Sequence, residues 1–298
     1  MIGEFAALGA ALCWTVSAVL YKRALTKVSP VAANTVRCAG TSLVLILALA
    51  LTGKIGVIAA LSAYSLFLAC ASGIIGLGLG DTLYMLSLKA IGVSRAVPIT
   101  CTYPLFSLVW AFLFAGETIT PEVVLGAAAI VFGIWLISIS KMDETLEKSE
   151  GKLHLKGVVF AVSTAIAWSI SISMINLAVK ESIGFEQAYA VNTVRIMAIS
   201  ILLVFSSLAS MGKLGSLRVG WENAVMLLAG GLVAIGLGWF FLTFSFTLIP
   251  ESQAVPISST TPLFSTLASL AFLHEKVTAK IALGSIMVVA GIFMVFAS

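Results

Sequence analysis

The chain has 298 residues, of which 60% are hydrophobic and 10% are charged, and its formal net charge is +4. This composition excludes a soluble globular domain and places the chain among integral membrane proteins. Because the basic residues lie between apolar stretches, their small excess is an orientation signal and not a surface for binding nucleic acid.

Apolar stretches long enough to cross a bilayer recur along the whole chain. A hydrocarbon core of about 30 Å needs about 20 apolar residues in a helix. We therefore predict an all-α integral membrane protein with ten transmembrane helices, near 3–21, 30–52, 62–88, 94–114, 121–140, 157–179, 187–210, 222–248, 252–273 and 279–297. No basic region precedes the first stretch, so we expect it to remain in the membrane and not to be cleaved as a signal peptide.

The first two predicted helices carry one aromatic and two polar candidates. Trp14, in the first helix, either faces a cavity or packs against a neighbour. Asn34 and Arg37 lie one turn apart on the second helix. A charge at this depth costs about 2.5–3.5 kcal/mol or more on insertion scales, so Arg37 is expected to face the protein interior and have a partner. That partner is either a carboxylate of the chain or an anionic group of a substrate.

Asp81, in the third predicted helix, is the only aspartate inside a predicted span. A carboxylate desolvated in a membrane is a candidate proton carrier. The alternative is a structural partner for Lys89 or for serines of a neighbouring helix. The run Gly78–Asp81 also resembles the G-x-G-D motif of intramembrane aspartyl proteases, which need a second aspartate nearby. The other aspartate, Asp143, lies in a polar connector, so the protease reading fails.

The fourth predicted helix is interrupted by Pro98 and Pro104. Because proline lacks an N–H, each frees the carbonyl four residues earlier. In hydrocarbon such carbonyls must face protein, hydroxyls or a wet cavity. The residues around the prolines are rich in hydroxyls, which either line a pathway or seal a structural kink. This helix closes at Glu117.

The second half of the chain repeats the first at an offset of 158. Ser94–Ser107 (SRAVPITCTYPLFS) returns as Ser252–Ser265 (SQAVPISSTTPLFS), with ten of the fourteen residues identical. With a four-residue change in one loop allowed for the tryptophans, the other matched pairs are Trp14 with Trp168, Asn34 with Asn192, Arg37 with Arg195, Gly78 with Gly236, Gly80 with Gly238, and Glu117 with Glu275. Asp81 breaks the symmetry, because its counterpart is Trp239. We infer two repeats, 1–141 and 157–298, joined by the polar connector 142–156.

Each repeat holds five predicted helices, an odd number, so the second copy is expected to run through the membrane in the opposite sense. Loops after the odd-numbered spans hold most of the Lys and Arg residues, whereas the other loops hold only Lys54 and Lys180. We expect the protein to lie in the plasma membrane. The positive-inside rule then places both termini on the side away from the cytoplasm. Inverted repeats around a central site are typical of secondary carriers.

The inverted arrangement suggests partners for the two arginines. We predict cross-repeat ion pairs, Arg37 with Glu275 and Arg195 with Glu117, and keep substrate binding by the guanidinium groups as the alternative. The candidate substrate-binding residues are Trp14, Asn34, Arg37, Asp81, Thr100, Thr102, Tyr103, Trp168, Asn192, Arg195, Ser258, Ser259 and Thr260. The candidate gating or structural residues are Pro98, Pro104, Glu117, Pro256, Pro262 and Glu275.

These motifs, in this order and repeated twice, resemble the EamA family of the drug/metabolite transporter superfamily. The shared features are a tryptophan in each first helix, an arginine early in each second helix, a proline-bearing fourth helix ending in glutamate, and a glycine-bearing fifth helix. The resemblance covers nearly the whole chain. It implies two inverted repeats of five helices and transport of a small metabolite, with efflux of an amino acid or related compound as the commonest role. His274 stands where the first copy has Gly116, a departure from the family pattern.

The residues favour a secondary carrier over two other classes. The two histidines, His154 and His274, lie far apart, and neither a metal site nor a cofactor is predicted. No nucleophile and base stand at catalytic spacing, which disfavours an enzyme. A passive channel or facilitator with the same fold stays as the alternative. The expected partners are a small-molecule substrate, membrane lipid and a coupling proton, with no nucleic acid.

Overall fold

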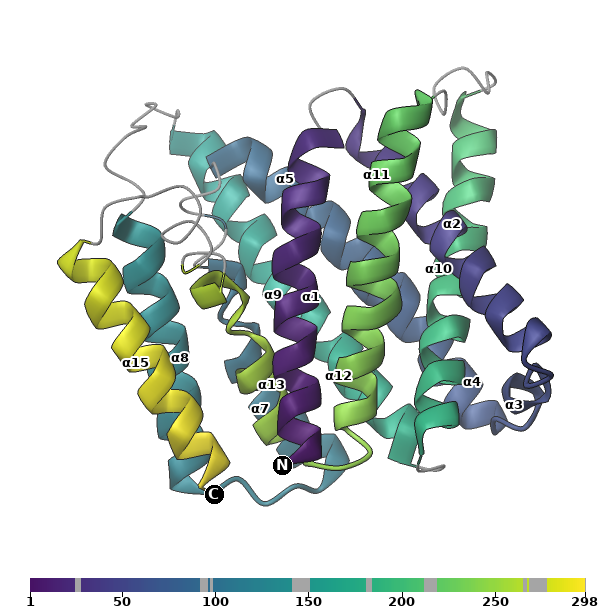
Figure 1. Ribbon diagram of the computed structural model, residues 1–298. Coiled ribbons are helices and arrows are strands. Elements are labelled where there is room, and N and C mark those ends of the chain that lie inside the picture. The colour runs from purple at the N-terminus through teal and green to yellow at the C-terminus, as the bar shows by residue number, and fades with distance from the viewer. Residues whose placement is uncertain are drawn as a thin grey trace.

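The computed structural model describes residues 1–24, 28–91, 96, 99–140, 151–180, 184–211, 219–264, 267 and 278–297. All regular structure within these ranges is helical. The elements are α1 (Ile2–Ala24), α2 (Pro30–Leu51), α3 (Gly56–Ala59), α4 (Ala63–Ser72), η1 (Gly73–Gly80), α5 (Asp81–Ile91), α7 (Tyr103–Ala115), α8 (Pro121–Ser140), α9 (Gly151–Lys180), α10 (Phe185–Met211), α11 (Trp221–Gly231), η3 (Leu232–Gly238), α12 (Trp239–Ser245), α13 (Glu251–Ser258) and α15 (Ala279–Phe296). Most helices lie side by side in one bundle, and α1 begins at the same end at which α15 finishes (Figure 1).

Within the described ranges, seven helical segments are long and apolar enough to cross a membrane: Ala32–Leu51, Ala63–Ser87, Pro121–Ser138, Leu155–Lys180, Phe185–Ser206, Trp221–Ser245 and Ala279–Phe296. Ile2–Ser17 and Tyr103–Ala115 are shorter apolar helices. These segments confirm an all-helical, multi-pass membrane protein. The count of ten stays a prediction, because parts of the fourth and ninth predicted spans lie outside the described residues. Helix α9 already begins at Gly151, inside the stretch predicted as a connector.

The fourth and ninth predicted spans are broken near their prolines. Helix α7 begins at Tyr103 after a turn at 101–102. Pro104 therefore lies in the first turn of a helix, where its missing N–H costs no helical hydrogen bond. This corrects the expectation that Pro104 interrupts a helix. Pro256 does lie inside α13, which ends at Ser258, and helical structure resumes at 261–264, where Pro262 lies. Pro98 is outside the described residues.

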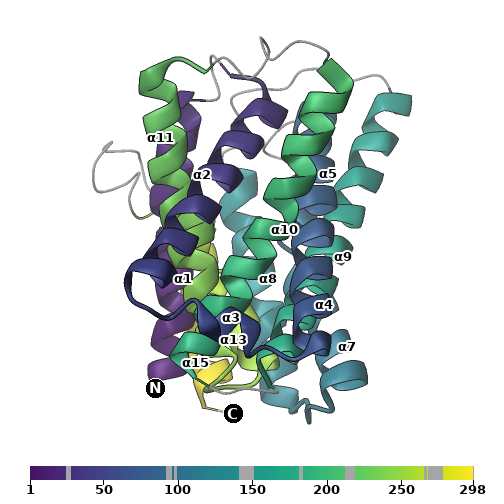
Figure 2. The same ribbon diagram turned by 90° about the vertical axis from the view of Figure 1, so that its right-hand side faces the viewer.

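Helices from the two halves of the chain pack against each other in matched pairs. Helix α1 packs on α11, η3 and α12, whereas α9 packs on α4, η1 and α5. Helix α2 lies against α10, and α7 against α13. In the turned view, α1 stands beside α11, and α9 stands beside α4 and α5 (Figure 2). The first helix of each half thus covers the third predicted span of the other half.

Both of those third spans contain a π-helical segment, η1 in the first half and η3 in the second. π-Helical turns are rare and are frequent at functional sites. The glycines in these segments let the neighbouring helices approach. A Cβ added at Gly76 would lie 2.3 Å from Ser171 Oγ on α9, and one added at Gly73 would lie 2.2 Å from the carbonyl oxygen of Arg195 on α10. In the second half, a Cβ added at Gly238 would lie 2.8 Å from Trp14 Nε1 on α1. Both segments are therefore held tightly at the contact between the two halves.

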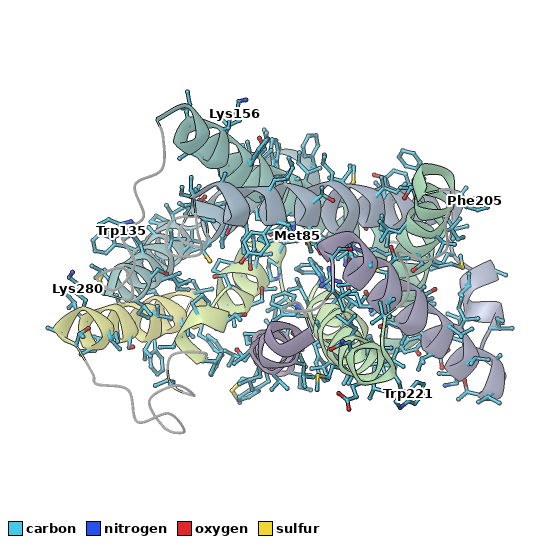
Figure 3. All side chains as sticks on the ribbon, turned by 90° about the horizontal axis from the view of Figure 1, so that it is seen from above. Met85, Trp135, Lys156, Phe205, Trp221 and Lys280 are labelled. Carbon is cyan, nitrogen blue, oxygen red and sulfur yellow. The ribbon has the colours of Figure 1, made fainter. Side chains whose placement is uncertain are left out.

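Helices α8 and α15 form a separate close pair at one edge of the bundle, where Trp135 and Lys280 are labelled (Figure 3). Their backbones touch at glycines, which let two helices approach closely. A Cβ added at Gly133 would lie 2.6 Å from the Gly284 carbonyl oxygen. One added at Gly291 would lie 2.6 Å from the Gly126 carbonyl oxygen. This pair is a packed scaffold beside the centre of the bundle.

Candidate functional site

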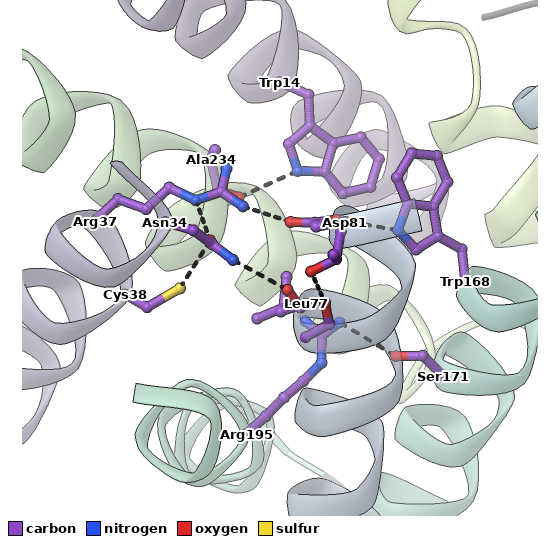
Figure 4. Close-up of polar contacts among 12 residues, drawn as sticks. Trp14, Asn34, Arg37, Cys38, Leu77, Asp81, Trp168, Ser171, Arg195 and Ala234 are labelled. Carbon is purple, nitrogen blue, oxygen red and sulfur yellow. Dashed lines mark hydrogen bonds and ion pairs between the residues drawn. The ribbon is translucent and has the colours of Figure 1, made fainter. Parts of the chain in front are cut away.

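A polar cluster at the centre of the bundle joins α2, α5 and α9 (Figure 4). The guanidinium group of Arg37 forms an ion pair with Asp81 Oδ2 and donates from Nε to Asn34 Oδ1 at 2.7 Å. The other carboxylate oxygen, Oδ1, accepts a hydrogen bond from Trp168 Nε1 at 3.1 Å. The side chains of Arg37 and Asp81 are only 13% and 15% exposed. The pair is therefore largely, but not completely, removed from solvent.

Arg195, the counterpart of Arg37, has a different partner. It is fully buried, and its Cζ lies 3.8 Å from the centre of the Trp239 ring, a cation–π contact. Its Nη2 also donates to Ser171 Oγ at 3.3 Å. Within the part of the chain that the structure describes, its Nε and Nη1 have no hydrogen-bond partner. Because Trp239 is the counterpart of Asp81, each arginine contacts the same position of its own repeat.

The remaining predicted residues of the second helices and the first-helix tryptophans also make matching contacts. Asn34 Nδ2 donates to the Leu77 carbonyl at 3.3 Å, and Asn192 Nδ2 donates to the carbonyl of Ile235, the counterpart of Leu77, at 3.0 Å. Trp168 reaches Asp81, whereas Trp14 Nε1 donates to the Ala234 carbonyl at 3.1 Å. Trp14 also packs edge-on against Trp239, with the ring centroids 5.3 Å apart. Both tryptophans therefore reach across to the opposite half.

Aromatic rings surround the carboxylate side of the cluster. Trp168 packs against Tyr84 and Tyr103, with centroid distances of 5.2 Å and 6.2 Å. Tyr103 begins α7, which packs on α13 of the second half, so its ring lies where the broken spans of the two halves meet. Tyr103 and Ser258 were predicted for the site, but Tyr84 was not. A signal for Tyr84 existed in the sequence, since it lies three residues after Asp81, one helical turn away.

The hydroxyls beside the helix breaks mostly bond to their own backbone. Thr102 Oγ1 donates to the Ile99 carbonyl at 2.6 Å. In the second half, three consecutive hydroxyls donate in the same way to carbonyls three residues earlier, namely Ser258 to Val255, Ser259 to Pro256 and Thr260 to Ile257. Thr100 is buried beside the first break. The sequence left two interpretations of these hydroxyls, lining a pathway or sealing a structural kink. Their bonds to backbone carbonyls favour the second.

Glu117 caps a helix of the other half instead of pairing with Arg195. Its two carboxylate oxygens accept from the backbone N–H groups of Glu251 and Ser252, both at 3.0 Å, at the start of α13. It also forms an ion pair with Lys180 at 3.3 Å. The predicted Arg195–Glu117 pair is therefore wrong: the first turn of α13 offers two unpaired donors that attract a carboxylate. Glu275, the predicted partner of Arg37, lies outside the described residues.

The charge on Glu117 is expected to stabilise the fold in a pH-dependent way. Burial by itself raises the pKa of Glu117, but the N–H groups of Ser252 and Glu251 and the charge of Lys180 hold the pKa below its usual value. A depressed pKa adds stability above the unfolded-state pKa of about 4.3, and that stability is lost as the pH falls through the folded-state pKa. We expect Glu117→Gln to lower the unfolding free energy by about 1–2 kcal/mol at neutral pH.

Thermal unfolding of the two proteins in detergent checks this expectation. The gap between wild type and Glu117→Gln should narrow as the pH is lowered to about 3. Glu222→Gln is the matched control, because Glu222 is exposed on the first turn of α11. A gap that stays constant over the same pH range would show that the charge of Glu117 does not contribute.

One buried acid, Glu251, was not among the residues predicted from the sequence. This side chain is fully buried and accepts hydrogen bonds from Ser107, Ser173 and Asn176. Its counterpart at the offset of 158 is Val93, so it breaks the symmetry just as Asp81 does. A charged residue directly after Pro250, at the start of a predicted span, was the available signal.

Comparison with known proteins extends these observations beyond the chain itself. The sequence pattern of the EamA-like transporter family matches this chain at residues 1–139 and 155–297. A protein of Archaeoglobus fulgidus named as an uncharacterized transporter is 24% identical over 294 residues, which cover 99% of this chain and 98% of that protein. The Bacillus subtilis uncharacterized transporter YvbV is 24% identical over 199 residues, 64% of this chain and 59% of that protein. A solved structure titled "Crystal structure of protein" has the same fold, with a TM-score of 0.80 and 15% identity over 99% of this chain and 97% of that chain.

The family match covers both halves of the chain and leaves out only the stretch between them and the last residue. Together with the names of the relatives, it identifies a membrane transporter and not an enzyme. The resemblance drawn from the repeated motifs is confirmed. The chain belongs to the EamA-like transporter family, within the drug/metabolite transporter superfamily.

Proposed function

We propose that this protein is a secondary carrier that moves an amino acid or a related small amphipathic metabolite across the plasma membrane, with efflux as the favoured direction. The observation that carries the proposal is the central cluster of Arg37, Asp81 and Arg195, which lies where the two halves meet. Charged residues inside a membrane bundle mark substrate and ion pathways. No other described cluster combines such charges with aromatic rings at that depth.

The charges of the cluster support a substrate that carries a carboxylate. The two arginines and one aspartate leave one positive charge in excess. Arg37 can release Asp81 to bind a carboxylate with its planar fork, and Asp81 can then accept an ammonium group. Tyr84, Trp168 and Tyr103 offer aromatic surface to an apolar side chain beside it. An amino acid has all three features.

The matched contacts of the two halves support alternating access to this site. Each first helix covers the π-helical segment of the other half, so the halves are interlocked around the cluster. Two equivalent arrangements related by an in-plane axis allow rocking between an inward-open and an outward-open form. The inverted relation itself, with five spans in each of two repeats, is part of the proposal.

The distribution of Lys and Arg among the loops assigns each end of the bundle to one side of the membrane. The end of the bundle at which α1 begins and α15 finishes faces away from the cytoplasm, and the opposite end faces the cytoplasm (Figure 1). A reporter that is active only in the cytoplasm, fused after the last residue, should be inactive. An active fusion would reverse the assignment.

Counterflow in proteoliposomes tests the proposed carrier. Vesicles loaded with one unlabelled amino acid at a time are diluted into the same labelled amino acid. A carrier is expected to accumulate label transiently, because internal substrate speeds the return of the loaded site. Asp81→Asn should lose this trans-stimulation, whereas Glu186→Gln, on an exposed ion pair with Lys54, should keep it.

A passive channel gives a different result. It equilibrates the label without an overshoot, whatever is loaded inside. Absence of an overshoot for every amino acid, in protein shown to be folded, overturns the proposed substrate class. Uptake without any trans-stimulation overturns the carrier mechanism.

A further inference from the structure

A buried acidic site lies at the end of the bundle at which α1 begins and α15 finishes, away from the Arg37–Asp81 cluster (Figure 1). Glu251, the first residue of α13, is completely inaccessible to solvent. Its Oε1 accepts from Ser173 Oγ and, at 3.1 Å, from Ser107 Oγ, and its Oε2 accepts from Asn176 Nδ2 at 2.9 Å. None of the ion pairs found among the described residues includes Glu251.

A second carboxylate stands next to it. Glu117 accepts from the backbone N–H of Glu251 at 3.0 Å and shares the Asn176 amide with it, at 3.4 Å. Lys180 lies 3.3 Å from Glu117 and is 39% exposed. Among the described residues, these two neighbouring carboxylates are matched by one cation, Lys180, which contacts only Glu117.

The other elements packed on α13 bring few charges to this end. Helices α1, α7, α8, α12 and α15 contact it. On α1 the titratable group at this end is Glu4, which pairs with the amino group of Met1 at 2.8 Å. On α8 it is Glu122, which is exposed to solvent. Helix α7 contributes the neutral Ser107, the described part of α12 has no ionisable side chain, and Lys280 of α15 lies one helix length away.

Burial and a neighbouring negative charge both favour the neutral form of a carboxyl group. When two acids in one site have different surroundings, the one without a cation keeps the proton. The hydrogen bonds around Glu251 suit both of its forms. A serine hydroxyl can donate to the carboxylate or accept from the acid, and an amide that turns over offers its oxygen instead of its nitrogen. Asn176 Oδ1 has no partner among the described residues.

The neighbouring Glu117 also borders a cavity at this end of the bundle. The cavity, of about 320 Å³, is lined by Glu117, Lys180, the end of α9 and the segment 246–250. Glu117, 8% exposed, stands between this cavity and Glu251. Protons from the side of the membrane at which the termini lie can therefore reach Glu117 first and Glu251 next.

We propose that Glu251 is a proton-binding site that exchanges protons through Glu117 and the adjacent cavity, and that it carries the coupling proton of the carrier. Only this last role rests on the proposed function. Asp81, the acid that the sequence suggested for it, already has Arg37 as its counter-ion. Release of the proton from Glu251 places a second negative charge at the start of α13, beside Glu117. The two negative charges then repel each other at the start of α13. Protonation of Glu251 is thereby coupled to movement of α13.

Infrared difference spectroscopy of the purified protein in lipid nanodiscs tests proton binding without any substrate. Between acidic and alkaline buffer, wild type should lose the carbonyl-stretching band of a protonated carboxylic acid. The midpoint should lie well above that of an exposed glutamate, because burial and the neighbouring carboxylate favour the neutral form. Glu251→Gln should lack this band, and Glu186→Gln, an exposed control, should keep it. Glu117→Gln should move the midpoint down by about one pH unit, because a neighbouring negative charge is removed.

A band that persists in Glu251→Gln overturns the proposal, as does a band lost only in Glu117→Gln. Thermal unfolding of each variant shows whether it is folded, and Glu251→Asp, which keeps the acid, should restore a titrating band. The counterflow experiment is independent of this test. A titrating band without counterflow refutes the proposed carrier but not the proton site, and counterflow without the band refutes only the proton site.

Discussion

Asp81→Ala is expected to lower the free energy of unfolding by about 3–5 kcal/mol, because it leaves the guanidinium of Arg37 desolvated without its carboxylate. The same substitution also removes the acceptor of Trp168 Nε1. The exposed pair of Lys54 and Glu186 is the matched control. Its side chains are 54% and 45% exposed, so Glu186→Ala should cost no more than about 1 kcal/mol. Chemical unfolding in the same detergent measures both values.

A double variant distinguishes the contribution of the Arg37–Asp81 pair to stability from its contribution to transport. Asp81→Asn with Arg37→Gln removes both charges and keeps the polar shape, so it should recover most of the stability lost in Arg37→Gln alone. It should not recover counterflow, since neither a fork for a carboxylate nor an acceptor for an ammonium group remains. Recovery of counterflow together with stability would mean that the pair is only structural.

Much of this fold could be predicted from the sequence because the chain repeats itself. Apolar length placed helices close to their observed limits, as for α2 at 30–51 against a predicted 30–52 and α8 at 121–140. Asn34 and Asn192, which correspond at the offset of 158, both donate to carbonyls that correspond at the same offset. A repeat constrains both copies, so weak signals in each add up.

The choice of partners could not be predicted in the same way. The depth of Arg37 in its helix allows it to meet any carboxylate at the same level. Only the placement of α2 within side-chain reach of the start of α5 selects Asp81. The π-helical segments that help to set this geometry have no signature beyond their glycines. The sequence does hold one signal for these partners. Asp81 and Trp239 correspond at the same offset of 158 as Arg37 and Arg195, so the two contacts form a matched pair.

The capping role of Glu117 and the burial of Glu251 depend on contacts between the halves. A carboxylate at the end of one broken span meets the first turn of another only when both spans are placed in space. Glu251 stands beside a proline at a predicted membrane boundary, where an exposed acid is common. Only its serine and asparagine neighbours, from two other helices, show that it is buried.

The contact between Arg195 and Trp239 is expected to be the second large contribution to stability. Trp239→Leu removes the ring face that lies 3.8 Å from the buried guanidinium, a loss of about 2 kcal/mol, and it also leaves a cavity. Arg195→Met replaces the buried charge by an apolar chain of similar length, which costs little. In the Arg195→Met background the cavity remains but the cation–π contact is already absent. Trp239→Leu should therefore cost about 2 kcal/mol less there than in wild type.

A double-mutant cycle of unfolding free energies measures this coupling, and additivity within about 0.5 kcal/mol would rule it out. Trp239→Phe, which keeps a ring face, should retain most of the coupling. A counterflow measurement on Arg195→Met then tests whether the charge of Arg195 contributes to transport. A ring face binds a guanidinium but does not neutralise it, so this side of the centre stays positive while Asp81 neutralises the other. If Arg195 draws a carboxylate to the site, the folded Arg195→Met protein loses transport even though its stability is intact.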